Sequence, residues 1–184
     1  MNGLLDEGKV REIGCSNFSD EQLEEAAAVA AAEGLRPFAV VQNQYSLLHR
    51  EPERGVLAAC ERLGMAFVPF FPLSSGALSG KYRRGKPAPG STRLGGGGGQ
   101  TSEEALGLER IEAVERLATF AETRGHTLLE LALSWLVSRP AVAAVVPGAT
   151  SAEQVRANAA ATGAWRLTPQ EIMEVDALLE RPPA

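Results

Sequence analysis

Three polar side chains lie at or just beyond the ends of two short apolar runs of the sequence. Ser16 and Asn17 follow the run 10–15, and Gln42 lies near the end of the run 38–43. Their hydroxyl and carboxamide groups are neutral donors and acceptors, which suit a planar amide that needs both. If the runs are parallel strands, their carboxyl ends meet at one edge and bring these groups together. The alternative is that Ser16 and Asn17 are turn and helix-entry residues.

A second group of candidates follows the last apolar run, 142–146. Gly148 and Thr150 come directly after it, before the start of an expected helix. A helix N-terminus presents free backbone amides and is a natural site for phosphate. Gln154 and Asn158 are four residues apart, so they share one face of that helix and both can reach an adenine.

The segment after the third apolar run is rich in small residues. Pro72, Leu73 and Ser75 begin it, and Lys81 ends it. Small side chains let backbone amides approach a pyrophosphate closely, and a lysine adds a point charge. Phe70, just before this segment, offers a flat ring for stacking on a ligand; the alternative is that it fills the core.

Strand–loop–helix units must position these candidates. The expected strands are the apolar runs 10–15, 38–43, 65–71 and 142–146, and the expected helices are 20–33, 52–63, 152–161 and 168–179. Ser19 with Gln22 forms a capping-box pattern at the first helix, and Gly34 fits its C-terminal stop. Ser151 is the expected cap of the helix 152–161. Alternating strands and helices indicate an α/β fold with a parallel sheet.

One long segment interrupts this alternation. Residues 74–106 are rich in Gly, Pro, Ser and basic residues, and 95–99 are five successive glycines. We expect a flexible loop there, either a lid or a plain link. Four units make half of an eightfold barrel or a small open sheet, and spacing alone leaves both open. Residues 14–17 do not form the glycine fingerprint of a doubly wound dinucleotide fold.

Composition narrows the class of protein. The 184 residues fit a single domain, 1–184, and the net charge of −5 argues against a nucleic-acid partner. No apolar run is long enough to span a membrane, which predicts no membrane partner. The two cysteines, Cys15 and Cys60, lack metal-ligand spacing. We expect a cytoplasmic protein without a metal.

The four motifs together resemble the second half of the aldo-keto reductases. The stretch 7–18, EGKVREIGCSNF, resembles the fifth strand of that family, and 40–47, VVQNQYSL, resembles the sixth. The stretch 69–82, PFFPLSSGALSGKY, resembles the seventh strand and its cofactor loop. The stretch 147–158, PGATSAEQVRAN, resembles the end of the eighth strand and the next helix, in the branch that includes potassium-channel β subunits. The resemblance implies an α/β fold, the C-terminal half of a TIM (β/α)8 barrel: about four parallel strand–helix units plus a C-terminal helix.

The resemblance also implies an oxidoreductase that reduces aldehydes or ketones with NADP(H) and uses no metal. By this resemblance the cofactor-binding residues are Ser16, Asn17 and Gln42 at the nicotinamide amide, Phe70 on its ring, Pro72, Leu73, Ser75 and Lys81 in the covering loop, and Arg93, Gly148, Thr150, Gln154 and Asn158 at the adenosine end. Gln154 stands where family members carry the arginine that grips the 2′-phosphate. Arg156 and Arg93 are the available substitutes.

The family's acid–base set of Asp, Tyr, Lys and His comes from the first four strands of the barrel. The sequence starts just before the fifth, and neither Tyr45 nor Tyr82 matches the catalytic tyrosine. We therefore expect no catalytic residue, and a truncated form that is inactive alone and acts on a small carbonyl substrate only if the barrel is completed. The alternative is a non-catalytic module that binds the nicotinamide cofactor or serves in assembly. Exposed sheet edges predict self-association.

Overall fold

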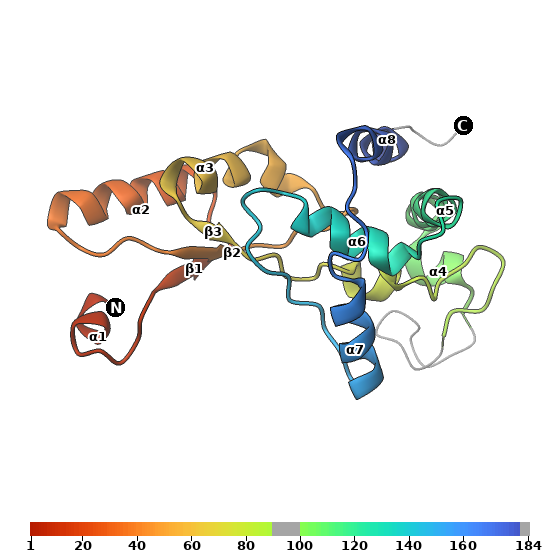
Figure 1. Cartoon of the computed structure of the whole chain (residues 1–184), viewed down its shortest axis with the longest axis horizontal. Coiled ribbons are helices and arrows are strands. Elements are labelled where there is room, and N and C mark those ends of the chain that lie inside the picture. The colour runs from red at the N-terminus through yellow and green to blue at the C-terminus, as the bar shows by residue number, and fades with distance from the viewer. Residues whose placement is uncertain (90–99, 181–184) are drawn as a thin grey trace.

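The computed structural model describes residues 1–89 and 100–180 of the chain. Strands and helices alternate in its first half, and helices make up the second half (Figure 1). The elements are α1 (Asn2–Asp6), β1 (Gly14–Ser16), α2 (Asp20–Glu33), β2 (Val40–Gln42), the 3-10 helix η1 (Glu51–Arg54), α3 (Val56–Leu63), β3 (Ala66–Phe67), the 3-10 helix η2 (Ser74–Ser79), α4 (Ser102–Leu106), α5 (Leu108–Glu122), α6 (Leu128–Val137), α7 (Ala152–Ala161) and α8 (Pro169–Glu180). None of the described helices is long and apolar enough to cross a membrane.

The strands form one parallel sheet in the order β1-β2-β3. Gly14 pairs with Val40, and a Cβ atom at Gly14 would lie only 2.6 Å from the Val40 carbonyl oxygen. A glycine is therefore required where β1 begins, because any side chain there would push the two strands apart. The sheet confirms the α/β class and the parallel pairing of the first three apolar runs, although each strand is shorter than the run that predicts it.

The two faces of the sheet differ. Cys15, Val41 and Phe67 are in register across the strands, and Val41 and Phe67 are fully buried. Figure 1 shows α2 and α3 together on one side of the sheet. Because side chains alternate along a strand, Ser16 and Gln42 lie on the opposite face, where Ser16 is exposed and Gln42 half-buried.

The prediction of a fourth strand at 142–146 is wrong. Val142 makes a single parallel bridge with Phe67, and the Ala143 N–H donates to the Phe67 carbonyl at 3.1 Å. Beyond Phe67 the ladder stops, since Pro69 has no N–H to continue it. Within the described part of the chain the sheet is therefore three strands with one bridged residue at its edge.

The predicted helix ends are confirmed where the prediction depends on residues close together in the sequence. Ser19 and Gln22 form the expected capping box on α2, and Gly34 closes that helix in the left-handed region. Ser151 caps α7 by accepting the Gln154 N–H at 3.2 Å. The expected helix 52–63 is divided by Gly55 into η1 and α3.

The segment expected to be a flexible loop, 74–106, contains regular structure at both ends. The 3-10 helix η2 occupies its start, and α4 occupies 102–106 with a capping box between Thr101 and Glu104. The segment is therefore not irregular throughout, and the glycines 95–99 lie outside the described residues. The helices α5 and α6 follow; neither is among the helices expected from the sequence.

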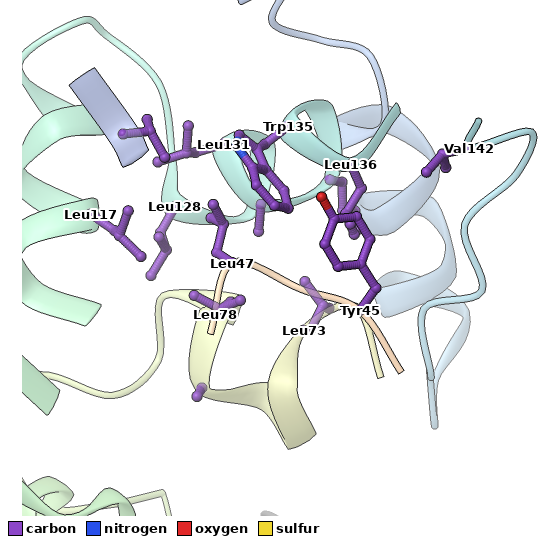
Figure 2. Packing of buried hydrophobic residues seen from close by; sticks show 14 of the residues in the cluster. Tyr45, Leu47, Leu73, Leu78, Leu117, Leu128, Leu131, Trp135, Leu136 and Val142 are labelled. Atoms are coloured by element: carbon purple, nitrogen blue, oxygen red, sulfur yellow. The ribbon is translucent and has the colours of Figure 1, made fainter. Parts of the chain in front are cut away.

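Much of the buried core lies between the helices of the second half and the segments around β2 and η2. Figure 2 shows Leu117, Leu128 and Leu131 of the helices facing Leu47 and Leu78. Trp135 of α6 and Tyr45 are fully buried, with ring centroids 5.2 Å apart. A shared core of this kind fixes η2 and the loop after β2 against the same helix, α6.

An ionic cluster closes this core on one side. The Tyr45 hydroxyl donates to Glu53 Oε1 at 2.7 Å, and Arg50 pairs with both Glu53 and Asp176 of α8, at 2.7 and 2.9 Å. Arg139 lies 4.2 Å from the centre of the Trp135 ring. Burial opposes the charge on Glu53, but hydrogen bonds from Arg50 and Tyr45 outweigh it and hold the pKa of Glu53 below its ordinary 4.5.

We predict that Glu53→Gln lowers the free energy of unfolding by about 1–2 kcal/mol near neutral pH, because it removes the charged acceptor of the cluster. A lowered pKa means that the carboxylate stabilises the fold above pH 4.5, and that this contribution disappears as pH falls through the lowered value. The gap between wild type and variant should therefore narrow in acid. Urea unfolding across a pH series measures it.

Glu51→Gln is the matched control. The Glu51 side chain is 74% exposed, and His49 is its ion-pair partner at 3.7 Å. Its substitution should change stability little at any pH. A gap between wild type and Glu53→Gln that stays constant from neutral to acidic pH would contradict the role assigned to the Glu53 charge.

Candidate functional site

The carboxyl ends of β1 and β2 are joined by hydrogen bonds from polar residues. The Ser16 hydroxyl donates to the Gln42 carbonyl at 2.7 Å, and the Asn17 N–H donates to the same oxygen at 3.1 Å. Asn17 adopts a left-handed conformation with φ of 60°, which turns the chain sharply out of β1. Ser16, Asn17 and Gln42 are thus brought together as the sequence predicts. Within residues 1–89 and 100–180, the side-chain amides of Asn17 and Gln42 have no hydrogen-bond partner.

Asn43 stabilises the turn that follows β1, and the sequence analysis did not predict this role. Its side-chain N–H donates to the Phe18 carbonyl at 2.8 Å, while its own carbonyl accepts the Phe70 N–H at 3.0 Å. The side-chain oxygen of Asn43 is buried without a hydrogen-bond partner among the described residues. One residue therefore ties the turn after β1 to the segment after β3. An asparagine just after a buried strand is the only sequence signal for it.

Phe70 lies next to these strand ends. A parallel bridge joins it to Gln44, and the residue is half-buried. Its ring meets that of Phe71 edge-on, with centroids 5.4 Å apart. Phe71 has a positive φ of 51° and is 44% exposed, because the strand has already ended there.

The covering segment 72–81 begins with buried residues and then turns in an unusual way. Pro72 and Leu73 are buried, and the three residues Ser74, Ser75 and Gly76 all have positive φ, at 48°, 59° and 98°. Each left-handed non-glycine residue costs about 1–3 kcal/mol, so the surroundings must hold this shape. Such conformations concentrate at ligand clamps and active sites.

Lys81 ends the covering segment with an exposed side chain that folds back over it. A Cβ atom at Gly76 would lie 3.1 Å from the Lys81 ammonium nitrogen. The glycine therefore leaves room for the cation next to the backbone of the turn. A cation above small residues is suited to a phosphate or pyrophosphate group.

Residues 147–158, here called the α7 turn, include the loop before α7 and its first two turns. They bring together four predicted site residues: Gly148, Thr150, Gln154 and Asn158. Gln154 Oε1 accepts from the Thr150 N–H at 2.7 Å and from the Thr150 hydroxyl at 3.2 Å. Asn158 is buried and lies 3.5 Å from the Gly148 carbonyl, at the limit of a hydrogen bond. A hollow of about 290 Å³ lies beside this turn, lined by Asn158 but not by Gln154. Gln154 thus holds the loop, and Asn158 faces the hollow.

The α7 turn is positioned through α6 and not by direct bonding to the strand ends. Helix α6 contacts both η2 and α7. Among the described residues, no hydrogen bond or ion pair joins the α7 turn to Ser16, Gln42 or the covering segment. Arg93 lies outside the described residues, so its predicted role is not addressed by the structure.

The two tyrosines are both fully buried. Burial, with a hydrogen bond to Glu53, raises the pKa of Tyr45 far above its ordinary value. Burial also raises the pKa of the Cys60 thiol to about 11. The described residues contain no group of three or more metal-ligating side chains that could hold an ion. The arrangement can hold an amide, a flat ring and a phosphate, through Gln42, Phe70 and Lys81 respectively.

Comparison with known proteins identifies the relatives of this chain. The sequence profile of the aldo/keto reductase family matches residues 1–180. An aldo-keto reductase of Metarhizium robertsii, dtxS3, is 33% identical over 89% of this chain and 43% of its own length. An L-glyceraldehyde 3-phosphate reductase of Escherichia coli O157:H7 is 28% identical, covering 92% of this chain and 49% of its own. A probable voltage-gated potassium channel subunit beta of Oryza sativa is 30% identical over all of this chain and 56% of its own. The chain thus spans about half the length of these relatives.

We predict that Asn43→Asp destabilises the chain by about 1–3 kcal/mol, because the donor to the Phe18 carbonyl is replaced by an acceptor in a buried place. Asn2→Asp is the matched control: the Asn2 side-chain oxygen accepts the Arg36 N–H at 2.9 Å, and an aspartate keeps that bond. Urea unfolding of both variants measures the difference. Equal stability of the two would show that Asn43 does not brace the turn.

Proposed function

Because the chain belongs to the aldo/keto reductase family, we propose that it binds NADP(H) at the carboxyl ends of its strands and contributes the cofactor-binding part of an oxidoreductase acting on aldehydes or ketones in the cytoplasm. The observation that supports this best is the register of β1 and β2, which places Ser16 opposite Gln42 on the sheet face turned away from α2 and α3. On this proposal β1–β3 are three strands of an eight-stranded barrel and Val142 lies at the position of a fourth.

The residues at the strand ends fit a nicotinamide. Its carboxamide needs one donor and one acceptor in a plane, and the side-chain amides of Asn17 and Gln42 offer both. Phe70 offers a half-buried ring on which a second ring can stack with an offset. NADPH would supply the hydride, and the residues of this chain would orient the face from which it leaves.

The covering segment and the α7 turn fit the rest of a dinucleotide. Ser75 and Gly76 in their left-handed conformations, with Lys81 above them, suit the pyrophosphate. The N-terminus of α7, which follows Gly148 and Thr150, suits a phosphate at the adenosine end, and the hollow beside Asn158 suits the adenosine. Gln154 is neutral and bonded to Thr150, so on this proposal the 2′-phosphate of NADP meets Arg156 or Arg93.

Proton transfer to a carbonyl needs a positioned acid. The buried Tyr45 hydroxyl already donates a hydrogen bond to Glu53, and Tyr82 is also buried. We therefore assign no catalytic residue to this chain, and propose that a small carbonyl substrate is reduced only when further residues complete the barrel. The second candidate is a non-catalytic cofactor-binding or assembly module, which the likeness to a potassium channel subunit favours.

We predict that NADPH binds the chain and that Gln42→Leu weakens binding about tenfold, the effect of losing one well-formed hydrogen bond of about 1.4 kcal/mol. Titration followed by NADPH fluorescence measures the Kd. Gln170→Leu, on α8, is the control and should leave the Kd unchanged, because Gln170 bonds to Glu174 on the same helix. A wild-type chain that leaves NADPH fluorescence flat would refute the proposal.

Reduction of an aldehyde by the bound NADPH, measured with and without the remaining strands of the barrel, separates the two candidates. Binding without turnover supports the module or an incomplete enzyme, whereas turnover by this chain alone would require an acid that we have not assigned. Adding the remaining strands as a longer reading frame, or as a second polypeptide, should then give turnover if the chain is part of an oxidoreductase.

We further propose that the β1 edge associates with a second copy of the chain. Within residues 1–89 and 100–180, β1 pairs only with β2, so its outer backbone groups face away from the sheet. An apolar groove of about 490 Å³ lies beside it, between α1 and α2, and Val29 and Leu35 on its rim are 47% and 39% exposed. An open edge next to exposed apolar side chains favours association.

Sedimentation equilibrium tests this proposal. The wild-type chain should associate, and Val29→Lys should shift it toward monomer, because a charge then enters the apolar groove. Val155→Lys is the control, since Val155 of α7 is also exposed, at 57%, but lies away from the groove. A wild-type chain that is monomeric at all concentrations would overturn the proposal.

A further inference from the structure

The covering segment 72–81 contains a buried contact that the proposed dinucleotide site does not itself explain. Ser74, the first of three successive left-handed residues, is almost fully buried. Its hydroxyl lies 2.8 Å from the hydroxyl of Ser46, which is fully buried in the loop after β2. These residues are 28 positions apart in the sequence. The contact therefore joins two separate segments at the point where the covering segment starts to turn.

Ser46 is held in place independently of Ser74. Its backbone pairs with His49 in both directions, with N–H to carbonyl distances of 3.0 and 3.1 Å. The Leu48 N–H donates to the Ser46 hydroxyl at 3.3 Å. Ser46 thus offers a fixed partner, and loss of its hydroxyl leaves the backbone of its own turn paired.

Two more contacts hold the same turn from other sides. Arg110 of α5 donates to the Ser74 carbonyl at 3.3 Å, and the Ser79 hydroxyl donates to the Gly76 carbonyl at 2.7 Å. The left-handed residues are therefore held at a hydroxyl and at two carbonyls. The Lys81 side chain folds back over the same turn, next to Gly76.

We propose that Ser46, with Arg110, is a positioning residue that holds the covering segment in its dinucleotide-binding shape before the dinucleotide arrives; this rests on the proposed function. An ordered segment binds more tightly because it does not lose conformational freedom on binding. Ser46 does not touch the ligand and acts through Ser74. Its hydroxyl sets both the order of residues 74–80 and the affinity for the pyrophosphate.

The hydroxyl pair makes a specific prediction about coupling. If either hydroxyl is removed, the other stays buried with fewer hydrogen-bond partners. The segment then loses more stability than the hydrogen bond alone contributes. Ser46→Ala and Ser74→Ala should each weaken NADPH binding about tenfold, and the double variant should weaken it by much less than the product of the two.

The experiment compares these variants in the full chain by two measurements. NADPH fluorescence titration gives the Kd, and hydrogen exchange without ligand gives the order of the amides in 74–80. Ser134→Ala is the matched control: Ser134 is also buried, and its hydroxyl contacts the Ala161 carbonyl and the Trp165 N–H. It should lower the melting temperature without changing the exchange in 74–80, because its partners Ala161 and Trp165 lie away from that segment.

Faster exchange in 74–80 together with weaker binding in Ser46→Ala, at a melting temperature no lower than that of Ser134→Ala, supports the proposal. Unchanged exchange in 74–80 overturns it, as does faster exchange with an unchanged Kd. A wild-type chain that does not bind NADPH refutes the proposed function, and with it the assignment of this shape to a dinucleotide. The exchange comparison still reports in that case whether Ser46 orders the segment.

Discussion

The parallel register of β1 and β2 is the constraint on which the candidate site depends. Gly14 allows the strands to approach, because its missing side chain leaves room for the Val40 carbonyl. That approach places Ser16 opposite Gln42, and both residues lie at the carboxyl ends of their strands. A slip of one residue in either strand would turn the side chain of that strand, Ser16 or Gln42, to the face that is packed against the helices.

Helices of the second half of the chain hold the segments that form the candidate site. Trp135 of α6 packs against Tyr45, and the same helix contacts η2 and α7, so one helix positions both the covering segment and the α7 turn. The ionic cluster around Glu53 then joins η1 to α8. Aromatic packing sets the position of α6, and charged groups close the core where it would otherwise meet water. The geometry of the site is therefore a property of the whole described chain.

Much of the fold could be predicted where the signal is local. The capping box at Ser19, the stop at Gly34 and the cap at Ser151 each depend on a few neighbouring residues, and the structure confirms them. The run 142–146 failed as a strand because pairing depends on a neighbour, and β3 ends before Pro69. Asn43 and Ser46 were missed for a related reason: their partners, Phe18 and Ser74, lie 25 and 28 residues away. Spacing within one motif carries no sign of such contacts. The grouping of Ser16, Asn17 and Gln42 was predictable because parallel strands end at a common edge.

A crystal structure of the chain grown with NADP+ tests the central claim most directly. The account predicts density for the nicotinamide against Phe70, with its carboxamide within hydrogen-bond distance of Asn17 or Gln42, and for the pyrophosphate under Lys81. Nucleotide bound elsewhere on the chain, or no nucleotide at saturating concentration, would contradict the account.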